Sequence, residues 1–384
     1  VSQALSIAKA SPSISGFSLP SAQKTNPVDG MLDEAILKLS PDDLLTQGDD
    51  IISEVASLDE RAVVIGGGIG IGAEAGVMLS SQGIEASGIS TSHGLGVQVS
   101  IDVDDQMTSS WESSSSRKLI GGIPDCVATA VEWAQKTRNP VDVQSDAQDT
   151  PVIMTSQGIS SLFSNIIRPS ILGERMVRGE SYWSGKLNEV VLDNHLTMMD
   201  DRRMEGGFGS GSRDAEGVPT SCHTIIENGT LRKMLWSSRD AAKNVSEGKT
   251  DSAESTGSAS RGSHMSPPVT GCGDVHLLSS KPPMSLDEMI ETMGTGYVIH
   301  SVMGAHTANP TSGDFSVTSS TVLRIEEGEI LGPIKQAGVS GNLFKALSKE
   351  VSLGHSSTRN GVSSTGTNHL SNVLFAQGMR INPA

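Results

Sequence analysis

The sequence has 384 residues, which is long enough to bury a substantial core and predicts two domains, or one domain with a large insertion. Its 28 Lys and Arg residues against 44 Asp and Glu residues give a formal net charge of -16, and such a surface repels nucleic-acid phosphates and anionic lipid headgroups. No apolar run approaches the roughly 18 residues of a membrane span, and the N-terminus lacks a signal-peptide pattern. We therefore expect a soluble cytoplasmic protein that binds neither nucleic acid nor membranes.

The cysteines are too few and too widely spaced to form a disulfide framework, which agrees with a reducing compartment. They are Cys126, Cys222 and Cys272. A metal site built on thiolate and imidazole ligands would have to draw on Cys272 and on the histidines His223, His264 and His276. Their spacing fits no compact zinc motif. We therefore expect a buried thiol beside loop histidines, and no metal site.

The first 30 residues are rich in Ser, Pro and Ala and predict an irregular lead-in. A helix start follows at Ser40-Pro41-Asp42-Asp43, with an N-cap serine, a proline in the first turn and early carboxylates. Apolar residues then recur along one helical face: Leu44, Leu45, Ile51, Ile52 and Val55.

The stretch AVVIGGGIGIGAEAGVMLSSQGIEASGIS, residues 62–90, raises the question of a nucleotide site. Gly68, Gly70 and Ala73 satisfy a relaxed G-x-G-x-x-A fingerprint, which would support a nucleotide-dependent oxidoreductase. A true fingerprint needs a helix after its glycines and a ribose-binding carboxylate about 20 residues later. Here the side chains alternate with the two-residue period of a strand, and the segment ends at ISTS without a carboxylate. We expect strands that bind no nucleotide.

The alternation continues in GVQVSIDVDD, so residues 62–103 predict three strands in an antiparallel meander, with SSQG at 80–83 as a turn. A second helix is predicted in GGIPDCVATAVEWAQKTRNP and ends at Asn139-Pro140. Its apolar stripe is Ile123, Val127, Ala130, Val131 and Ala134. Sheet and helices together predict an N-terminal α/β domain over residues 31–145, followed by a linker at 142–150.

Residues 150–384 predict a β-rich C-terminal domain with one prominent helix, so the fold class is α+β. That helix carries Ile159, Leu162, Phe163, Ile166 and Ile167 on one face, and Pro169 should end or kink it. Two β-hairpins are predicted: one turns at Asn228-Gly229 in HTIIENGTLRKML, and the other turns around Gly328 in VLRIEEGEILGPI.

Carboxylates gather in the loop DDRRMEGGFGSGSRDAEGVPT at Asp200, Asp201, Asp214 and Glu216. Such a group could serve acid/base chemistry or bind calcium, but the spacing is not that of an EF-hand. We expect turn and cap residues that shape a cleft wall. No G-x-S-x-G elbow occurs, so the sequence does not support a serine hydrolase.

An ordered series of segments resembles the C-terminal domain of the TldD/PmbA family, also called modulators of DNA gyrase. These segments are GESYWSGKLNEVVLDNHLTMMDD, GSRDAEGVPTSCHTIIENGTLRKML, STGSASR, GYVIHSVMGAHTANPTSGDFS and GPIKQAGVSGNL. SSQGIEASGISTS is similar to a hairpin of the family's N-terminal domain, so the resemblance covers nearly the whole chain from about residue 40. The family is known for metal-dependent peptidases in which a TldD subunit pairs with a PmbA (TldE) subunit. The resemblance therefore implies cytosolic peptide processing.

The catalytic branch of that family carries a zinc-binding H-E-x-x-x-H on the helix before a Gly-then-Ser segment, and a cysteine ligand near the C-terminus. Counting back from that segment places Ser164, Asn165 and Pro169 at the matching positions. A hydroxyl is a poor zinc ligand, an amide cannot act as general base at neutral pH, and proline offers no donor atom. The last cysteine is Cys272. The chain is thus similar to the PmbA/TldE branch.

The resemblance implies a non-catalytic subunit that holds no zinc itself and completes the peptide cleft of a zinc-bearing TldD-like subunit. Alone, such a chain is expected to form a homodimer. The candidate cleft residues are Asp214, Glu216, His306, Asp314 and Asn342. Loops concentrate binding functions, although a lone loop histidine is more often only solvated. An independently active hydrolase that uses unidentified residues remains the alternative, so whether the chain is an enzyme stays open.

Overall fold

The computed structural model describes residues 2–143, 150–263, 265–355, 358–363 and 366–383. His264 and most of the predicted linker at 142–150 lie outside these residues. Helices and several separate sheets alternate along the described chain, so the predicted α+β class is confirmed. Every helix among the described residues is too short or too polar to cross a lipid bilayer.

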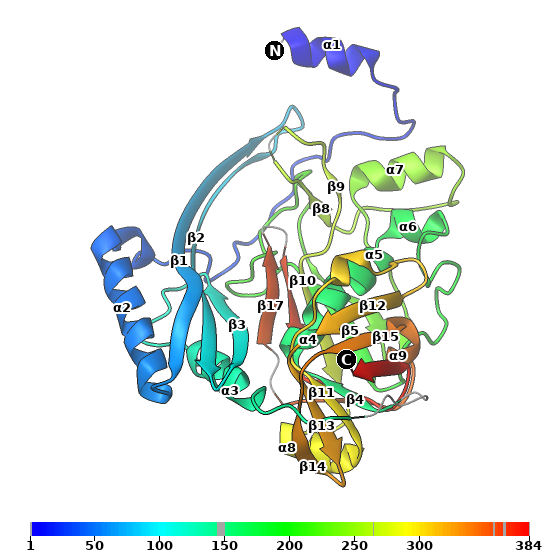
Figure 1. Ribbon diagram of the computed structural model, residues 1–384. Helices are drawn as coiled ribbons and strands as arrows, with labels where there is room; N and C mark the ends of the chain where they lie inside the picture. The colour runs from blue at the N-terminus through cyan, green and yellow to red at the C-terminus, as the bar shows by residue number, and fades with distance from the viewer. Residues whose placement is uncertain (1, 144–149, 264, 356–357, 364–365, 384) are drawn as a thin grey trace.

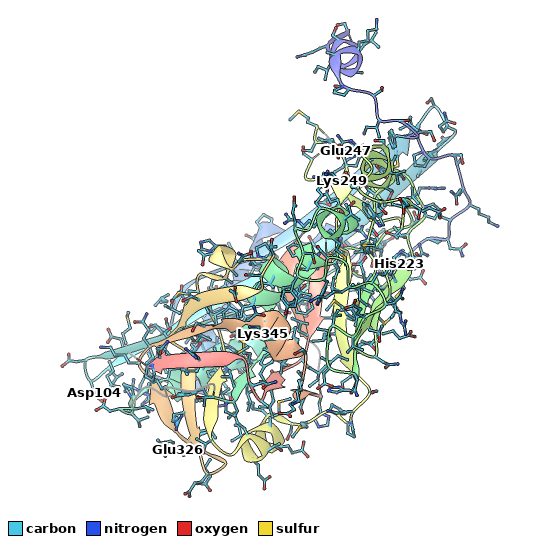
Figure 2. All side chains as sticks on the ribbon, turned by 90° about the vertical axis from the view of Figure 1, so that its right-hand side faces the viewer. Asp104, His223, Glu247, Lys249, Glu326 and Lys345 are labelled. Carbon is cyan, nitrogen blue, oxygen red and sulfur yellow. The ribbon has the colours of Figure 1, made fainter. Side chains whose placement is uncertain are left out.

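The lead-in contains a helix that its composition does not predict. Helix α1 spans Ser2–Ala10 and buries none of its residues. Figures 1 and 2 show it standing away from the rest of the molecule in two perpendicular views. The chain then runs along the body, where Arg203 donates hydrogen bonds to the carbonyls of Asn26 and Pro27. The lead-in is therefore irregular only after residue 10.

Two helices cover one face of the N-terminal sheet, as predicted. Helix α2, Pro41–Leu58, begins with a full capping box in which Ser40 and Asp43 exchange hydrogen bonds, and a short 3-10 helix, η1 (Ile36–Lys38), precedes it. Helix α3 spans Asp125–Lys136. Its predicted stripe is buried except for Ile123, which precedes the helix and is 38% exposed.

The N-terminal sheet is an antiparallel meander, but its strand boundaries differ from the prediction. Its strands are β1 (Ala62–Leu79), β2 (Glu85–Val103) and β3 (Gln106–Ser116), in the order β1-β2-β3. The two segments expected as the second and third strands form the single strand β2. The third strand follows a tight turn at Asp104 and Asp105, both with positive φ. No helix begins near Gly72, and the absence of nucleotide binding stays a prediction.

The β1–β2 hairpin extends beyond the two helices that cover its base. Near the base, Leu95, Val97, Val99 and Ile101 are at most 4% exposed and pack against α2 and α3. Near the tip, Val77 is 73% exposed. Figure 1 shows the hairpin as a long arched arm. The chain at the tip of the hairpin packs against the C-terminal domain. Ile84 lies so close to Gly217 that a Cβ atom added to this glycine would be 2.4 Å from Ile84 Cδ1.

The described residues of the C-terminal domain form four sheets. The first sheet comprises, in order, β14 (Glu329–Ile334), β13 (Val322–Glu326), β11 (Gly296–Ile299), β4 (Val152–Met154), β19 (Val373–Phe375) and β16 (Val351–Leu353). The second comprises β17 (Thr358–Ser363), β18 (Gly366–Leu370), β10 (Asp274–Ser279), β5 (Leu196–Asp201), β6 (Cys222–Glu227) and β7 (Thr230–Leu231). The smaller sheets are β12 (Asp314–Ser319), β15 (Ala337–Asn342) and β20 (Met379–Pro383), and β8 (Ala259–Ser260) with β9 (Val269–Thr270).

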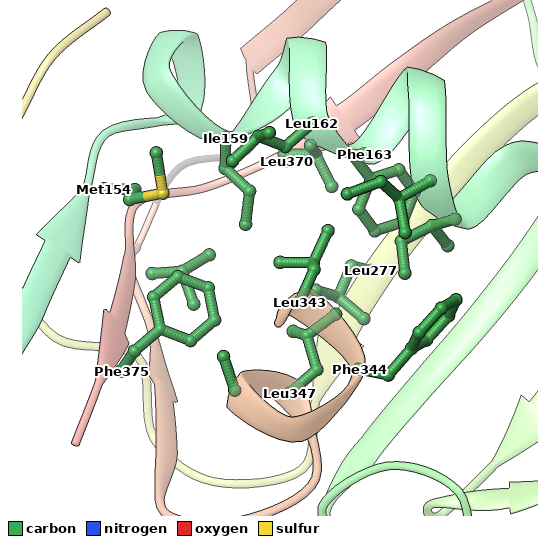
Figure 3. Close-up of a cluster of buried hydrophobic side chains, with 14 of the residues drawn as sticks. Met154, Ile159, Leu162, Phe163, Leu277, Leu343, Phe344, Leu347, Leu370 and Phe375 are labelled. Atoms are coloured by element: carbon green, nitrogen blue, oxygen red, sulfur yellow. The ribbon is translucent and has the colours of Figure 1, made fainter. Parts of the chain in front are cut away.

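The predicted prominent helix runs through the core as one segment with a wider turn in its middle. It consists of α4 (Ser156–Leu162), a π-helical turn η2 (Phe163–Ile167) and α5 (Arg168–Ser170), followed by α6 (Gly173–Val177). All five residues of its predicted apolar face are fully buried. Figure 3 shows this segment lying over Leu343 and Leu347 of helix α9 (Leu343–Leu347). The segment ends at Ser170, directly after Pro169, as predicted.

Both predicted hairpins are confirmed. Strands β6 and β7 turn at Asn228 and Gly229, and β13 and β14 turn at Glu327 and Gly328. All four turn residues have positive φ, which matches the right-handed twist of the strands they join. The remaining helices are α7 (Ser238–Ser246), α8 (Leu286–Met293) and the short η3 (Ala305–Thr307).

A side chain of α3 anchors the N-terminal domain to the C-terminal domain. Trp133 is 4% exposed and belongs to a core cluster whose other members, such as Ile153 and Leu323, come from the C-terminal domain. Its ring stacks on His300 with 4.0 Å between ring centroids. The other side of His300 contacts the carboxylate of Glu112 on β3. Apolar burial of Trp133 and the contact between His300 and Glu112 therefore join the domains at this point.

We predict that Trp133→Ala lowers the free energy of unfolding by about 3–5 kcal/mol, because it removes a large buried ring that cannot be replaced by water. Trp111→Ala is the matched control. Trp111 is 47% exposed, so its loss should cost less than about 1 kcal/mol. Urea unfolding followed by circular dichroism measures both. Equal losses in the two variants would contradict the anchoring role of Trp133.

Candidate functional site

The three positions that match the family's metal site lie on the central helical segment, and one of them, Ser164, contacts the second sheet. Ser164 Oγ accepts a hydrogen bond from Asn368 Nδ2 at 2.7 Å. Asn165 Nδ2 donates to the carbonyl of Ser161 at 2.8 Å, within its own helix. Pro169 has no donor atom. The two polar side chains are therefore already paired, and none of the three is an imidazole, thiolate or carboxylate ligand.

A guanidinium group lies beside these positions and joins three segments of the chain. Arg168 Nη1 donates to the carbonyls of Gly273 and Thr367, both at 3.1 Å, and to Asn368 Oδ1 at 3.3 Å. Its Nη2 donates to the carbonyl of Cys272 at 3.1 Å. This side chain places a permanent positive charge between the helix, the start of β10 and strand β18.

The thiol of Cys272 is held in its protonated form. The residue is 5% exposed, and its Sγ donates to the carbonyl of Arg168 at 3.4 Å. Burial raises the pKa of Cys272 to about 12, although the nearby Arg168 opposes the shift. Because the thiolate is the form that binds metal, this cysteine is a poor ligand at neutral pH. The expected buried thiol is confirmed, but the expected loop histidines are not, because His276 lies on strand β10 and His223 on strand β6.

Asp274 and two histidines form a polar group on the face of β10 opposite the hydrophobic core. Asp274 Oδ1 accepts from the amide and hydroxyl of Thr367, and its Oδ2 accepts from the amide of Gly209. His276 stacks on His369 with 4.3 Å between centroids. Burial lowers the pKa of His276 to about 4, so it is neutral at pH 7. Among the described residues, no three His, Cys, Asp or Glu side chains come together as metal ligands.

The candidate cleft residues Asp214 and Glu216 act on neighbouring backbone, as turn and cap residues do. Asp214 is 4% exposed and accepts from the amides of Glu216, Val218 and Ala259. Glu216 accepts from the amides of Ser238 and Arg239 in the first turn of α7. Burial raises the pKa of both carboxyls. Whether they border a substrate cleft stays a prediction.

The other candidates fall into one pair and one separate residue. Asp314 and Asn342 are paired across β12 and β15, and Asn342 Nδ2 donates to Asp314 Oδ1 at 2.8 Å. Asn342 Oδ1 also accepts from the amide of Lys345 and caps α9. His306 is exposed in η3, and its side chain makes no hydrogen bond within the described chain. The structure therefore does not bring the five candidates together.

Arg168 and Asn368 are functional candidates that the sequence does not reveal. They contact each other although 200 residues separate them. Neither belongs to a local motif, and only the position of Arg168 directly before Pro169 draws attention to it. The contact depends on parallel pairing of β18 with β10, which local patterns do not predict.

Comparison with known proteins assigns the chain to a family. A model of the PmbA/TldA metallopeptidase C-terminal domain matches residues 147–377. The chain belongs to the PmbA/TldD family. The crystal structure of TldE from Thermococcus kodakarensis superposes with a TM-score of 0.87 at 26% identity, covering 99% of this chain and 83% of that one.

Sequence relatives support the assignment of the chain to the PmbA/TldD family. An uncharacterized protein of Methanocaldococcus jannaschii is 27% identical over 332 residues, 86% of this chain and 74% of that protein. A metalloprotease PmbA homolog of Haemophilus influenzae is 26% identical over 294 residues, 75% of this chain and 60% of that protein. Several metalloprotease relatives are matched over only 35% to 41% of their own length.

We predict that Arg168→Ala lowers the free energy of unfolding by about 3 kcal/mol, because it leaves several buried acceptors without a donor. Arg232→Ala is the control. The side chain of Arg232 is 47% exposed and pairs with Glu227, so its removal should change stability by less than about 1 kcal/mol. Chemical unfolding of both variants tests this, and an unaltered midpoint for Arg168→Ala would refute the linking role.

Proposed function

We propose that this chain is the non-catalytic, TldE-type subunit of a two-subunit metallopeptidase that processes peptides. One observation carries the proposal: the Arg168 guanidinium lies beside the positions that match the metal site, bound to four acceptors. A fixed positive charge beside these positions opposes the binding of a divalent cation. The TldE crystal structure, which covers nearly the whole chain, supports the same branch.

The chemistry of the surrounding side chains also argues against zinc in this chain. Zinc prefers imidazole, thiolate and carboxylate ligands, whereas the matching positions offer a hydroxyl, an amide and a proline. Ser164 Oγ is already an acceptor for Asn368, and the Cys272 thiol stays protonated. The residues present do not fit the metal, so we assign no catalytic step to them. A TldD-type partner would supply the zinc and its general base, and this chain would complete the peptide cleft.

The alternative of an independent hydrolase could draw on a Ser-His-Asp arrangement. Ser279 Oγ lies 2.9 Å from His195 Nδ1, and His195 Nε2 lies 3.3 Å from Asp193 Oδ2. His195 is only 5% exposed, and Ser279 Oγ already accepts from the amide of Lys281. Ser279 is half-buried, but its partner His195 is buried and the Ser279 hydroxyl is held by backbone, so this set is better explained as a structural link between the segment before β5 and the end of β10.

We predict that the isolated chain contains no stoichiometric zinc and cleaves no peptide, and that cleavage appears on mixing with a TldD-type subunit that bears the histidines. Metal analysis by mass spectrometry, with peptide cleavage assayed with and without a chelator, measures both. Ser164→His, Asn165→Glu and Pro169→His combined should give weak metal binding at best, because no thiolate is present and Arg168 remains. Stoichiometric zinc with chelator-sensitive cleavage by the unmodified chain would establish the independent hydrolase instead.

We predict that the purified chain forms a homodimer when its partner is absent. Strand β1 is an edge strand of 18 residues, and its exposed Val63 and Ile65 would favour pairing with another surface. Light scattering at micromolar concentration measures the mass directly. A monomer would contradict this prediction without affecting the assignment to the TldE branch.

A further inference from the structure

A small cavity lined by three arginines lies between two of the segments that resemble the family. Its volume is about 160 Å³. Arg202 and Arg213 come from the loop after β5, and Arg261 follows β8. The segments GSRDAEGVPT and STGSASR each supply one of these arginines, Arg213 and Arg261. Each of the three guanidinium groups links neighbouring backbone segments, and the proposed partner role does not explain why all three converge on one cavity.

Each arginine is fixed by part of its guanidinium and keeps donors free. Arg202 is 5% exposed and donates only through Nη2, to Ser260 Oγ and to two carbonyls. Arg213 donates through Nη1 and Nη2 to the carbonyls of Gly217 and Gln23. Arg261 donates through Nε and Nη1. Within the described residues, Arg202 Nη1, Arg213 Nε and Arg261 Nη2 donate to nothing.

The charge at the cavity wall is positive although the chain as a whole is strongly negative. Asp214 is the carboxylate at the wall, and both of its oxygens already accept backbone hydrogen bonds. Asp200 Oδ2 lies 3.6 Å from Arg202 Nε, although burial raises the pKa of this carboxyl. The charges of Arg213 and Arg261 have no carboxylate within 4.0 Å in the described chain, which leaves a positive surplus.

The size of the cavity limits the ligand. At about 30 Å³ for each water molecule, it holds on the order of five waters. Cavities that hold cofactors or drug-sized ligands are larger, on the order of 300 Å³ or more. Guanidinium groups bind carboxylate and phosphate oxygens through paired, charge-assisted hydrogen bonds. The cavity therefore matches a single oxyanionic group.

We propose that this cavity binds one oxyanion, a phosphate group or the carboxylate of a small molecule or peptide terminus, through Arg202, Arg213 and Arg261. The site goes beyond the proposed partner role and does not depend on it. Arg202 forms its rigid inner wall, since its Nη2 is fixed by three acceptors. Arg261 forms the outer wall, because it is exposed while its Nε and Nη1 are held by the carbonyls of Ala215 and Ser266.

The test uses the full chain and isothermal titration with inorganic phosphate, with chloride adjusted to hold the ionic strength constant. The unmodified chain should bind one phosphate per chain with saturation. Arg261→Gln should weaken binding about 10- to 100-fold, the effect of one lost charge-assisted contact. Arg203→Gln is the matched control, because Arg203 lies on the same loop but donates to the lead-in carbonyls outside the cavity. Its affinity should stay within about twofold of the unmodified chain.

Parallel titrations with N-acetylalanine and N-acetylalaninamide identify the source of the oxyanion. Binding of the acid without the amide assigns a carboxylate, and binding of phosphate alone assigns a phosphate group. Circular dichroism of Arg261→Gln checks its fold, and Arg213→Gln repeats the test if that variant unfolds. The absence of saturable binding of either oxyanion, or an equal loss in Arg203→Gln, would overturn the site.

Discussion

Polar groups buried at the start of β10 must find hydrogen-bond partners, and this requirement organises the centre of the molecule. An unpaired buried donor or acceptor costs about 1–3 kcal/mol, and more when it is charged. Asp274 is fully buried, and its two oxygens accept from loop 207–210 on one side and β18 on the other. Arg168 satisfies the carbonyls beside it. The helix, the loop and the sheet are therefore held together through the same few atoms.

The same requirement limits the chemistry that this region can perform. A metal site needs ligands whose lone pairs are free, but here the oxygens of Ser164, Asp274 and Asn368 are already acceptors. Burial also keeps Cys272 protonated. A hydrogen-bond network of this kind stabilises a scaffold, which agrees with a subunit that shapes a cleft while its partner carries out the reaction.

The elements that the sequence predicts well are those encoded by neighbouring residues. The capping box at Ser40 lies within four residues, and the Asn228-Gly229 turn needs only two. The sequence does not indicate strand β3. Six of its 11 residues are serine, so it lacks the apolar alternation that is typical of a strand. It forms because β2 offers it a complete antiparallel partner. The sequence analysis does not predict helix α1 either. Its residues favour a helix locally, but the helix buries no apolar face against a packing partner.

Functional contacts depend on pairing between distant segments, so their residue types alone do not reveal them. The loop carboxylates at Asp214 and Glu216 draw attention because acid/base chemistry uses such groups, yet both serve neighbouring backbone amides. The arginines of the same region draw no attention in the sequence, because Arg213 and Arg261 come together only after β8 has folded against the loop. The position of the cavity at the surface, with Arg202 buried, Arg213 half-buried and Arg261 exposed, also changes how charge acts on a bound anion. The net charge of -16 on the chain repels an anion at long range. Salt screens this long-range repulsion over about 8 Å at physiological ionic strength. Contacts inside a small cavity are screened much less. Added salt therefore removes the long-range repulsion before it weakens the attraction at the partly buried arginines, which distinguishes this oxyanion site from a fully exposed basic patch.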